Sequence, residues 1–370
     1  SVSDFLDFPN DWSTEAMTSA VDNGLFLGND NKLIQPGKAL TRAELAAFVT
    51  RAFGATAKAD ISHVTDVSPD DWFYEDVAKA YQMGAITGTS DTTFSPNAYI
   101  TRQEVFLVLA RALCLSGTDA SALDRFTDKD DISDWARNAI IVMSQNGYVN
   151  GYPDGSFKPL ANITRAELAQ VFHNIFKTYI DVPGYHTSVA NVGSVMIRTP
   201  GVHLENVVIN GDLVISDGVG AGDFDLSSVT VNGKIILRGG EGKVTFKNVT
   251  VRDGVIVYDQ NGIVNFNNYR TDAPFRNFTD LTGSTFLKEQ TEIITPGGST
   301  GGNGGGGGTT TYYTVIFNVD GEEYETKTVK SGQRVNEITA PAKTGYTFKY
   351  WSEAEEGEEA YDFSTPVRYS

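Results

Sequence analysis

The fold of the first half of this chain is decided by one stretch, residues 151–168, which reads GYPDGSFKPLANITRAEL. It joins a turn-rich loop to a Thr-Arg-x-Glu tetrad. Two earlier tetrads precede it, and a Trp stands 30 residues ahead of each tetrad Arg: Trp12 with Arg42, Trp72 with Arg102 and Trp135 with Arg165. Glycines keep the same register, 12 residues after each Trp (Gly24, Gly84, Gly147) and 16 residues after it (Gly28, Gly88, Gly151). This register indicates three copies of an internal repeat.

The residue pattern of each copy predicts two helices joined by a loop. After the tetrads, apolar residues recur at helical spacing: Leu45, Phe48, Val49 and Phe53, then Val105, Val108, Leu109 and Leu113, then Leu168, Val171, Phe172 and Phe176. The segment after each Trp predicts another helix, which ends at the first repeat glycine. Each tetrad also fits a capping box, in which the Thr accepts from first-turn N–H groups and the Glu reaches back to the cap. We therefore assign a structural, helix-capping role to Thr41, Glu44, Thr101, Glu104, Thr164 and Glu167.

The tetrad arginines stand where a helix disfavours them. A cation in the first turn faces the positive end of the helix dipole, at a cost on the order of a few tenths of a kcal/mol. Beside free N–H groups, Arg42, Arg102 and Arg165 would form an anion site, since a guanidinium binds a carboxylate at two points. The alternative is a structural salt bridge to an acidic neighbour, such as Asp7, Asp66 or Asp128.

The three repeat tryptophans allow two interpretations. Trp12, Trp72 and Trp135 are either core anchors or faces on which a sugar ring stacks, because an indole is large and apolar but carries a polar N–H. The sequence does not decide between these roles.

Residues from about 5 to 180 resemble three tandem S-layer homology repeats, above all in the loop at 151–159 and the stretch Asn162-Ile163-Thr164-Arg165-Ala166-Glu167. The resemblance implies an all-α, pseudo-threefold unit with three prongs. In this family the grooves between prongs bind cell-wall polysaccharide, commonly one that bears a pyruvate ketal. The carboxylate of such a ketal would suit the anion site expected at the arginines.

The resemblance also implies roles for single residues. It makes Arg42, Arg102 and Arg165 the carboxylate partners, Gly28, Gly88 and Gly151 close backbone contacts, and Trp12, Trp72 and Trp135 the groove walls. Two departures stand out: Lys32-Leu33-Ile34 occupies the place of Gly155-Ser156-Phe157, and Gln103 stands where the other copies have Ala. We therefore expect one or two of the grooves to bind weakly or not at all.

Composition limits the possible partners. The chain has 29 Lys and Arg against 47 Asp and Glu, a net charge of −18, which argues against sequence-independent nucleic acid binding. Its one cysteine, Cys114, excludes an intrachain disulfide and is expected to be buried. No apolar run is long enough to span a membrane. The start at Ser1 lacks a signal segment, so we expect a processed form if the protein is secreted.

From about residue 186 to 290 the pattern changes to short β-branched runs with polar turns. Comparable runs begin at Leu204, Leu226 and Phe246, with periods of 22 and 20 residues, and a second apolar strand follows each one. Units of this length, none able to bury its apolar face alone, predict a β-solenoid-like all-β region. A β-sandwich made of hairpins is the alternative.

An enzyme is the sharper hypothesis for this region, because many β-helical proteins cleave polysaccharides. The candidate acids are Asp212, Asp217, Asp223, Asp225 and Asp253. Most of them lie in Gly-rich turns, which favour Asp for conformational reasons. We therefore expect turn chemistry, no catalytic residue and no enzyme. The scattered histidines show no metal-ligand spacing, so we also expect neither a metal nor a cofactor.

Residues 296–311 are rich in Gly and predict a flexible linker. Beyond it, the strands around Asp320-Gly321 predict a hairpin, and residues 312–367 resemble the Listeria–Bacteroides repeat, a small β-grasp-like module of bacterial surface proteins. The family usually closes with one more apolar strand, which is lacking before Ser370. We expect either a fragment of a longer chain or an exposed edge.

These expectations make a multidomain chain, divided as follows: repeat 1 at 1–58, repeat 2 at 59–118, repeat 3 at 119–183, the solenoid at 186–290, the linker at 296–311 and the β-grasp-like module at 312–370. We expect a secreted protein of the bacterial cell wall, anchored noncovalently to an anionic secondary cell-wall polysaccharide attached to peptidoglycan. The β regions would act as outward spacers or adhesive elements, with an unknown outward partner. The alternatives are an anchored glycan-active enzyme and a self-assembling surface-lattice subunit.

Overall fold

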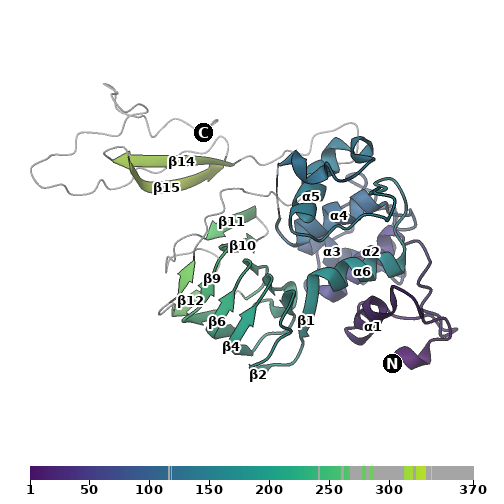
Figure 1. The fold of residues 1–370 in the computed structure, drawn as a ribbon, viewed down its shortest axis with the longest axis horizontal. Coiled ribbons are helices and arrows are strands. Elements are labelled where there is room, and N and C mark those ends of the chain that lie inside the picture. The colour runs from purple at the N-terminus through teal and green to yellow at the C-terminus, as the bar shows by residue number, and fades with distance from the viewer. Residues whose placement is uncertain are drawn as a thin grey trace, which may run out of the picture. The chain divides into compact units, whose positions relative to one another are not determined.

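The computed structural model describes residues 1–259 except 116, 118 and 241, and then residues 262–266, 277–280, 284–286, 312–319, 322–330 and 335. The chain divides into two compact units, Ser1–Asn303 and Gly304–Ser370. The first unit holds a helical part and a β-solenoid, and the second holds a hairpin (Figure 1).

Three helix pairs make up the helical part: α1 (Thr14–Asp22) and α2 (Arg42–Ala52), α3 (Tyr74–Met83) and α4 (Arg102–Ala112), and α5 (Asp134–Gln145) and α6 (Arg165–Ile175). Short 3-10 turns lie at Val2–Asp4, Ala120–Leu123 and Lys129–Asp131. The expected helix stops are confirmed, because Gly24, Gly84 and Gly147 follow the first helix of each pair with φ of 70°, 69° and 73°. Left-handed backbone of this kind suits glycine, which has no Cβ to clash.

The second helix of each pair begins at its tetrad. Thr41 accepts a hydrogen bond from the N–H of Glu44 at 3.2 Å, and Thr164 accepts one from Glu167 at 3.2 Å. In the second copy, the carboxylate of Glu104 also accepts from the N–H of Thr101 at 2.7 Å. These bonds satisfy N–H groups that have no partner inside the helix.

The three copies meet around a pseudo-threefold axis. Leu40 N–H donates to the carbonyl of Ile163, Ile163 donates to Ile100, and Ile100 donates back to Leu40, at 3.0, 3.3 and 3.0 Å. All three side chains are fully buried. This closed ring of backbone bonds joins one segment from each copy, so no copy completes the centre alone.

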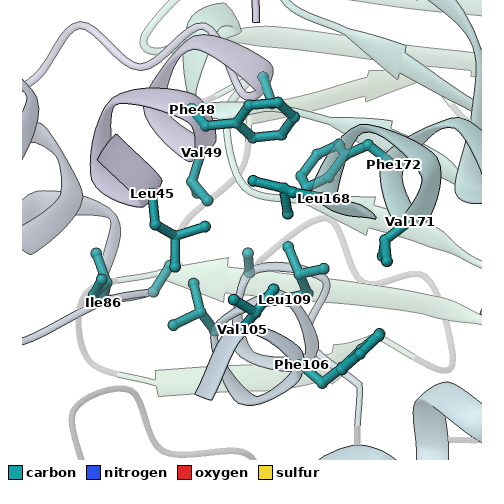
Figure 2. Close-up of a cluster of buried hydrophobic side chains, with 14 of the residues drawn as sticks. Leu45, Phe48, Val49, Ile86, Val105, Phe106, Leu109, Leu168, Val171 and Phe172 are labelled. Atoms are coloured by element: carbon teal, nitrogen blue, oxygen red, sulfur yellow. The ribbon is translucent and has the colours of Figure 1, made fainter. Parts of the chain in front are cut away.

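The core of the helical part forms where α2, α4 and α6 converge. Leu45, Val105 and Leu168 come from the three helices into one apolar cluster (Figure 2). Phe48 and Phe172 pack edge to face with ring centroids 4.7 Å apart. Each such side chain stabilises the fold by about 1.5–3 kcal/mol when it is buried completely.

The β region is a solenoid, as the period of its runs predicts. One sheet has the order β1 (Phe176–Ile180), β3 (Ser194–Ile197), β5 (Leu213–Ile215), β7 (Ile235–Leu237), β10 (Val255–Asp259) and β11 (Gly262–Phe266). The other contains β12 (Asn277–Asp280), β8 (Lys243–Lys247), β6 (Phe224–Val231), β4 (Val202–Ile209) and β2 (Gly184–His186), with β9 (Thr250–Val251) and β13 (Thr285–Phe286) beside this path. Pairing between coils is parallel, with Leu213 opposite Ile235 and Ile235 opposite Val255. A sandwich of hairpins would pair its neighbouring strands antiparallel, so the sandwich alternative is wrong.

Corners of successive coils repeat the same backbone shape. Asn206, Ser228 and Asn248 have φ of 57°, 54° and 52°, a left-handed conformation that Asn tolerates better than most residues. A side-chain ladder also links the coils, because Asn232 Nδ2 donates to Asn210 Oδ1 at 2.6 Å. The polar residues of the turns thus stack from coil to coil.

The solenoid packs against the ends of the helices. Met196, Val214, Ile236 and Ile256 project from its first sheet into the same apolar cluster as the helices. Arg198 donates to the carbonyl of Asn23 at 3.1 Å, just after α1, and Arg238 donates to the carbonyl of Met83 at 2.7 Å, the last residue of α3. A cation stabilises the negative end of a helix dipole. Helices and solenoid therefore share one core.

In the second unit, β14 (Tyr312–Val319) and β15 (Glu322–Lys330) form an antiparallel hairpin. This confirms the hairpin expected around Asp320-Gly321. The expected linker at 296–311 and the later strands of the β-grasp-like module lie outside the described residues.

Candidate functional site

The tetrad arginines are buried and reach into the next repeat. Arg42 and Arg102 are 8% and 6% exposed, and the side chain of Arg165 is 11% exposed. Each Nε donates to a backbone carbonyl at 2.8 Å: Arg42 to Phe94, Arg102 to Phe157 and Arg165 to Ile34. Repeat 1 therefore holds repeat 2, repeat 2 holds repeat 3, and repeat 3 holds repeat 1.

Each arginine also faces the tetrad glutamate of the repeat that it enters. Arg102 Nη1 lies 2.9 Å from Glu167. Arg165 lies 3.6 Å from Glu44, and Arg42 lies 4.0 Å from Glu104. Thus Glu44, Glu104 and Glu167 do more than cap helices. They provide the negative charge that buried guanidinium groups need.

The aspartates considered as partners of the arginines act elsewhere. Asp128 accepts from the N–H groups of Phe157 and Lys158, both at 2.8 Å. The equivalent loops of repeats 1 and 2 are held in the same way. Asp7 accepts from the N–H groups of Ile34 and Gln35, and Asp66 accepts from those of Phe94 and Ser95. The expected alternative of a salt bridge to an acidic neighbour is therefore found, but with the tetrad glutamates. The aspartates named as examples are the wrong partners, because their carboxylates bind loop N–H groups.

One groove between repeats combines residues of all three predicted classes. It is lined by Arg42, Ile86, Thr87, Gly88, Thr89, Glu104, Leu107, Val108, Arg111 and Trp135, and we call it the Arg42 groove. It encloses about 540 Å³, part of which is open to solvent. Arg42 comes from repeat 1, Gly88 from repeat 2 and Trp135 from repeat 3. By threefold equivalence, Arg102, Gly151 and Trp12 define the Arg102 groove, and Arg165, Gly28 and Trp72 define the Arg165 groove.

The electrostatics of the Arg42 groove favour an anion. Burial lowers the pKa of Arg42, while Glu104 opposes this change, and burial also lowers the pKa of Arg111. A guanidinium nevertheless stays protonated in proteins. Arg42 uses Nε and Nη2 for the carbonyls of Phe94 and Thr87, and its contact with Glu104 is long. Two cations thus line a groove that contains one carboxylate.

The tryptophans lie on the surface. Trp12 and Trp72 are each 63% exposed, and Trp135 is 37% exposed. The interpretation of these residues as core anchors is therefore wrong, and apolar residues such as Leu45 fill the core instead. An exposed indole at the edge of a groove offers a flat apolar face to a ring.

The second repeat glycines are required by their own loops. A Cβ at Gly28 would overlap the ring of Phe5, and a Cβ at Gly88 would overlap the carbonyls of Ser90 and Thr93. Gly151 has φ of 62° and sits against Phe126. Gly88 also lines the Arg42 groove, but loop packing alone accounts for all three glycines.

Two polar residues near the groove have a role that sequence patterns do not predict. Gln103 Nε2 donates to Ser133 Oγ at 3.0 Å, and Ser133 N–H donates to Gln103 Oε1 at 3.0 Å. Ser133 is the N-cap residue of α5, the helix that carries Trp135. The only sequence signal was that Gln103 differs from the alanines of the other two copies.

The solenoid carboxylates mostly hold the fold. Asp212 is 6% exposed and accepts from the N–H of Lys234, and Asp223 accepts from the N–H of Lys243. Asp217, in the 3-10 turn Asp217–Val219, forms an ion pair with Arg238 at 2.7 Å. Asp253 lies in the turn before β10, where its N–H donates to the carbonyl of Gly233 at 3.0 Å. These contacts fit the turn chemistry expected for them.

Asp225 differs from the other candidate acids, because it pairs with His203 on the outer face of the solenoid. His203 lies 3.2 Å from Glu205 as well, and its ring contacts that of Tyr185 with centroids 4.3 Å apart. Within the described part of the chain, no group of three or more His, Cys, Asp and Glu side chains could hold a metal ion. Nor does any described helix have the length and apolar character to cross a membrane.

Parts of the chain are similar in sequence to known proteins. An amylopullulanase of Thermoanaerobacterium thermosulfurigenes is 30% identical over 176 residues, which are 47% of this chain and 9% of that protein. The surface-layer 125 kDa protein of Lysinibacillus sphaericus is 33% identical over 164 residues, 44% of this chain and 14% of that protein. A cellulosome-anchoring protein of Acetivibrio thermocellus is 32% identical over 145 residues, which are 38% of this chain and 32% of that protein. The chain thus spans less than a third of each of these relatives.

Family comparison assigns both ends of the chain. Residues 4–46, 65–106 and 125–169 match the S-layer homology domain, and these ranges contain all three tetrads. Residues 313–370 match the Listeria-Bacteroides repeat domain. The chain therefore carries three S-layer homology domains, followed by a β-solenoid and a Listeria-Bacteroides repeat domain.

Proposed function

We propose that the three S-layer homology domains anchor this chain noncovalently to an anionic secondary polysaccharide of the bacterial cell wall, one that carries pyruvate ketals. The observation that carries the proposal is the Arg42 groove. It places a buried guanidinium and an exposed indole on one surface, although the residues come from repeats 1 and 3.

The chemistry of the groove suits a sugar that bears a carboxylate. A guanidinium binds a carboxylate through charge-assisted hydrogen bonds, and an indole covers the apolar face of a ring. The chain as a whole has a net charge of −18, so long-range attraction does not draw it to an anionic polymer. Binding would depend on local cations, and Arg42 and Arg111 provide them in this groove.

The relatives support an anchoring role. Proteins named as an amylopullulanase, a surface-layer protein and a cellulosome-anchoring protein share similarity with 38–47% of this chain. Similarity to proteins with such different names suits attachment to a surface better than one particular reaction. In this proposal the solenoid and the C-terminal domain are outward spacer or adhesive elements, and the chain is not an enzyme.

A pull-down on purified cell walls tests the anchor. The full chain is compared on native walls and on walls stripped of their accessory polysaccharide, beside the triple variant Trp12→Ala, Trp72→Ala and Trp135→Ala. These side chains are exposed, so the variant should keep its fold. Tyr185→Ala, an aromatic residue of the solenoid that is 76% exposed, is the matched control.

We expect binding of wild type and of the Tyr185 variant to native walls only, and loss of binding in the triple variant. Equal binding to stripped walls, or full binding by a folded triple variant, would refute the anchor proposal.

A glycan-active enzyme remains the second candidate because of the carboxylates Glu205 and Asp225 beside His203. Release of reducing ends from wall polysaccharide, abolished in Glu205→Gln and Asp225→Asn, would establish it. Absence of release with active wall binding would leave the anchor proposal as it stands. The surface-lattice alternative predicts ordered sheets of purified protein in electron micrographs, and the anchor proposal predicts none.

A further inference from the structure

The three grooves differ in how their tryptophans are held. Trp12 and Trp72 precede their helices, since α1 begins at Thr14 and α3 at Tyr74. Trp135 lies inside its helix, because α5 begins at Asp134. This earlier start accompanies a lower exposure, 37% against 63% for each of the others. Trp135 is thus part of a helix face that forms one wall of the Arg42 groove.

Gln103 fixes the start of α5. Gln103 is 3% exposed, and its side-chain amide forms two hydrogen bonds with Ser133, each at 3.0 Å. In one bond the amide nitrogen donates, and in the other the amide oxygen accepts. The bond from Ser133 N–H also satisfies a backbone donor at the start of the helix. Gln103 itself is held in α4, where its N–H donates to the carbonyl of Pro159 at 3.0 Å. The amide therefore joins α4 and α5 two residues away from Trp135.

The other copies cannot make this connection. Ala43 and Ala166 occupy the position of Gln103, and a methyl group neither donates nor accepts a hydrogen bond. The groove walls differ as well: the place of Arg111 is taken by Asn174 in the Arg102 groove, where the amide oxygen of Asn174 accepts from Gln170. In the Arg165 groove that place is taken by Arg51, so the Arg42 and Arg165 grooves share an arginine here.

We propose that the Arg42 groove is the groove through which this chain binds anionic polysaccharide most tightly, and that Gln103 is a positioning residue that holds Trp135 for stacking. The inference rests on the proposed anchoring function and concerns which groove performs it. Gln103 does not line the groove, so it acts through Ser133 and α5 rather than by touching the sugar. The ligand class is a pyranose that carries a carboxylate, with the anion at Arg42 and the ring at Trp135.

Titration of the full chain with solubilised, pyruvylated wall polysaccharide tests the proposal. Trp135→Ala should weaken binding about tenfold, a loss of about 1.4 kcal/mol of binding free energy, because the ring then has no indole on which to stack. Trp12→Ala and Trp72→Ala, in the other two grooves, are the comparison variants and should weaken binding less than Trp135→Ala does. Tyr185→Ala, outside the grooves, is the matched control and should leave binding unchanged. Gln103→Ala, which restores the residue of the other copies, should weaken binding about three- to tenfold.

Two readouts separate positioning from a general loss of stability. In a Trp12→Phe, Trp72→Phe and Trp351→Phe background, Trp135 is the one remaining tryptophan of the chain. Polysaccharide should then change its fluorescence, and Gln103→Ala should reduce that change while the thermal unfolding midpoint stays within a few degrees. Gln103→Glu keeps an acceptor for the N–H of Ser133 and another for its hydroxyl. It should therefore retain more affinity than Gln103→Ala.

The outcomes distinguish this inference from the proposed function. Equal losses in Trp12→Ala, Trp72→Ala and Trp135→Ala, or wild-type affinity and fluorescence response in Gln103→Ala, would overturn the preference for the Arg42 groove while anchoring stands. Failure of wild type to bind the polysaccharide at all would overturn the anchoring function, and this inference with it.

Discussion

Arg102 and Glu167 stand 65 residues apart in the sequence, yet Nη1 of the first lies 2.9 Å from a carboxylate oxygen of the second. The same oxygen accepts from the hydroxyl of Tyr152 at 2.8 Å. Glu167 belongs to the tetrad of the third repeat and Arg102 to the tetrad of the second. The tetrad thus serves as a helix cap and as a link between repeats.

The first prediction concerns this link. Glu167→Gln should lower the free energy of unfolding by about 1–3 kcal/mol, because it removes the charge that faces a buried guanidinium. Urea unfolding measures the change. The control is Glu75→Gln, whose side chain is 57% exposed in its pair with Lys58 and should change stability by less than about 1 kcal/mol. Equal effects of the two substitutions would contradict a linking role for Glu167.

A second prediction concerns the junction of helices and solenoid. The side chain of Arg238 is completely buried, pairs with Asp217 and donates to Met83. Arg238→Ala should destabilise the protein by about 3–5 kcal/mol, because Asp217 is left with an uncompensated charge. Arg252→Ala, an exposed arginine of a solenoid turn, is the control.

Calorimetry should also show the helices and the solenoid unfolding in one transition, since they share a core. Two separate transitions, or a small effect of Arg238→Ala, would show that the junction contributes little to the fold.

The third prediction uses the single thiol. Cys114 is 2% exposed, and burial raises its pKa to about 11 despite the opposing charge of Arg238. The thiolate is the reactive form, so maleimide should not label the folded protein at neutral pH but should label it in urea. Rapid labelling without denaturant would contradict the burial of this cysteine. Arg238→Ala should accelerate labelling, because it weakens the packing around the thiol.

The fourth prediction concerns alkaline pH. Burial raises the pKa of Tyr152 from 10.0 to about 12, Arg102 opposes this rise, and the hydrogen bond to Glu167 adds to it. The folded state then holds the phenolic proton more tightly than the unfolded state. The contribution of Tyr152 to stability is therefore fully present below about pH 10 and is lost as the pH rises towards about 12. Tyr152→Phe should reduce the slope of stability against pH in that window, whereas exposed Tyr99→Phe should not. Identical slopes in both variants would refute this assignment.

Much of the helical part could be predicted because its signals are local. Helical spacing after Thr41, Thr101 and Thr164 and the stops at the repeat glycines depend on a few neighbouring residues. The solenoid was predictable for a similar reason, since a period near twenty residues places like residues in successive coils. The identity of the arginine partners could not be predicted. Glu44 reaches Arg165 only after the chain closes its ring of three repeats, and nothing local marks that contact.

The site was predictable in type but not in arrangement. The sequence indicated Arg, Gly and Trp as classes, yet one groove takes Arg42, Gly88 and Trp135 from three different copies. The residue type alone left the tryptophans either buried or exposed, and their exposure depends on how the helices pack. The role of Gln103 depends on Ser133, 30 residues away, and on where α5 begins.

The most direct measurement is the location of bound sugar in crystals of the full chain soaked with a pyruvylated amino sugar. The account predicts density for the carboxylate beside Arg42 and for the ring against Trp135, within the Arg42 groove. Soaking with the same sugar without its ketal should give weaker density or none. Density confined to the solenoid face around His203, or to the Arg102 and Arg165 grooves alone, would contradict the account.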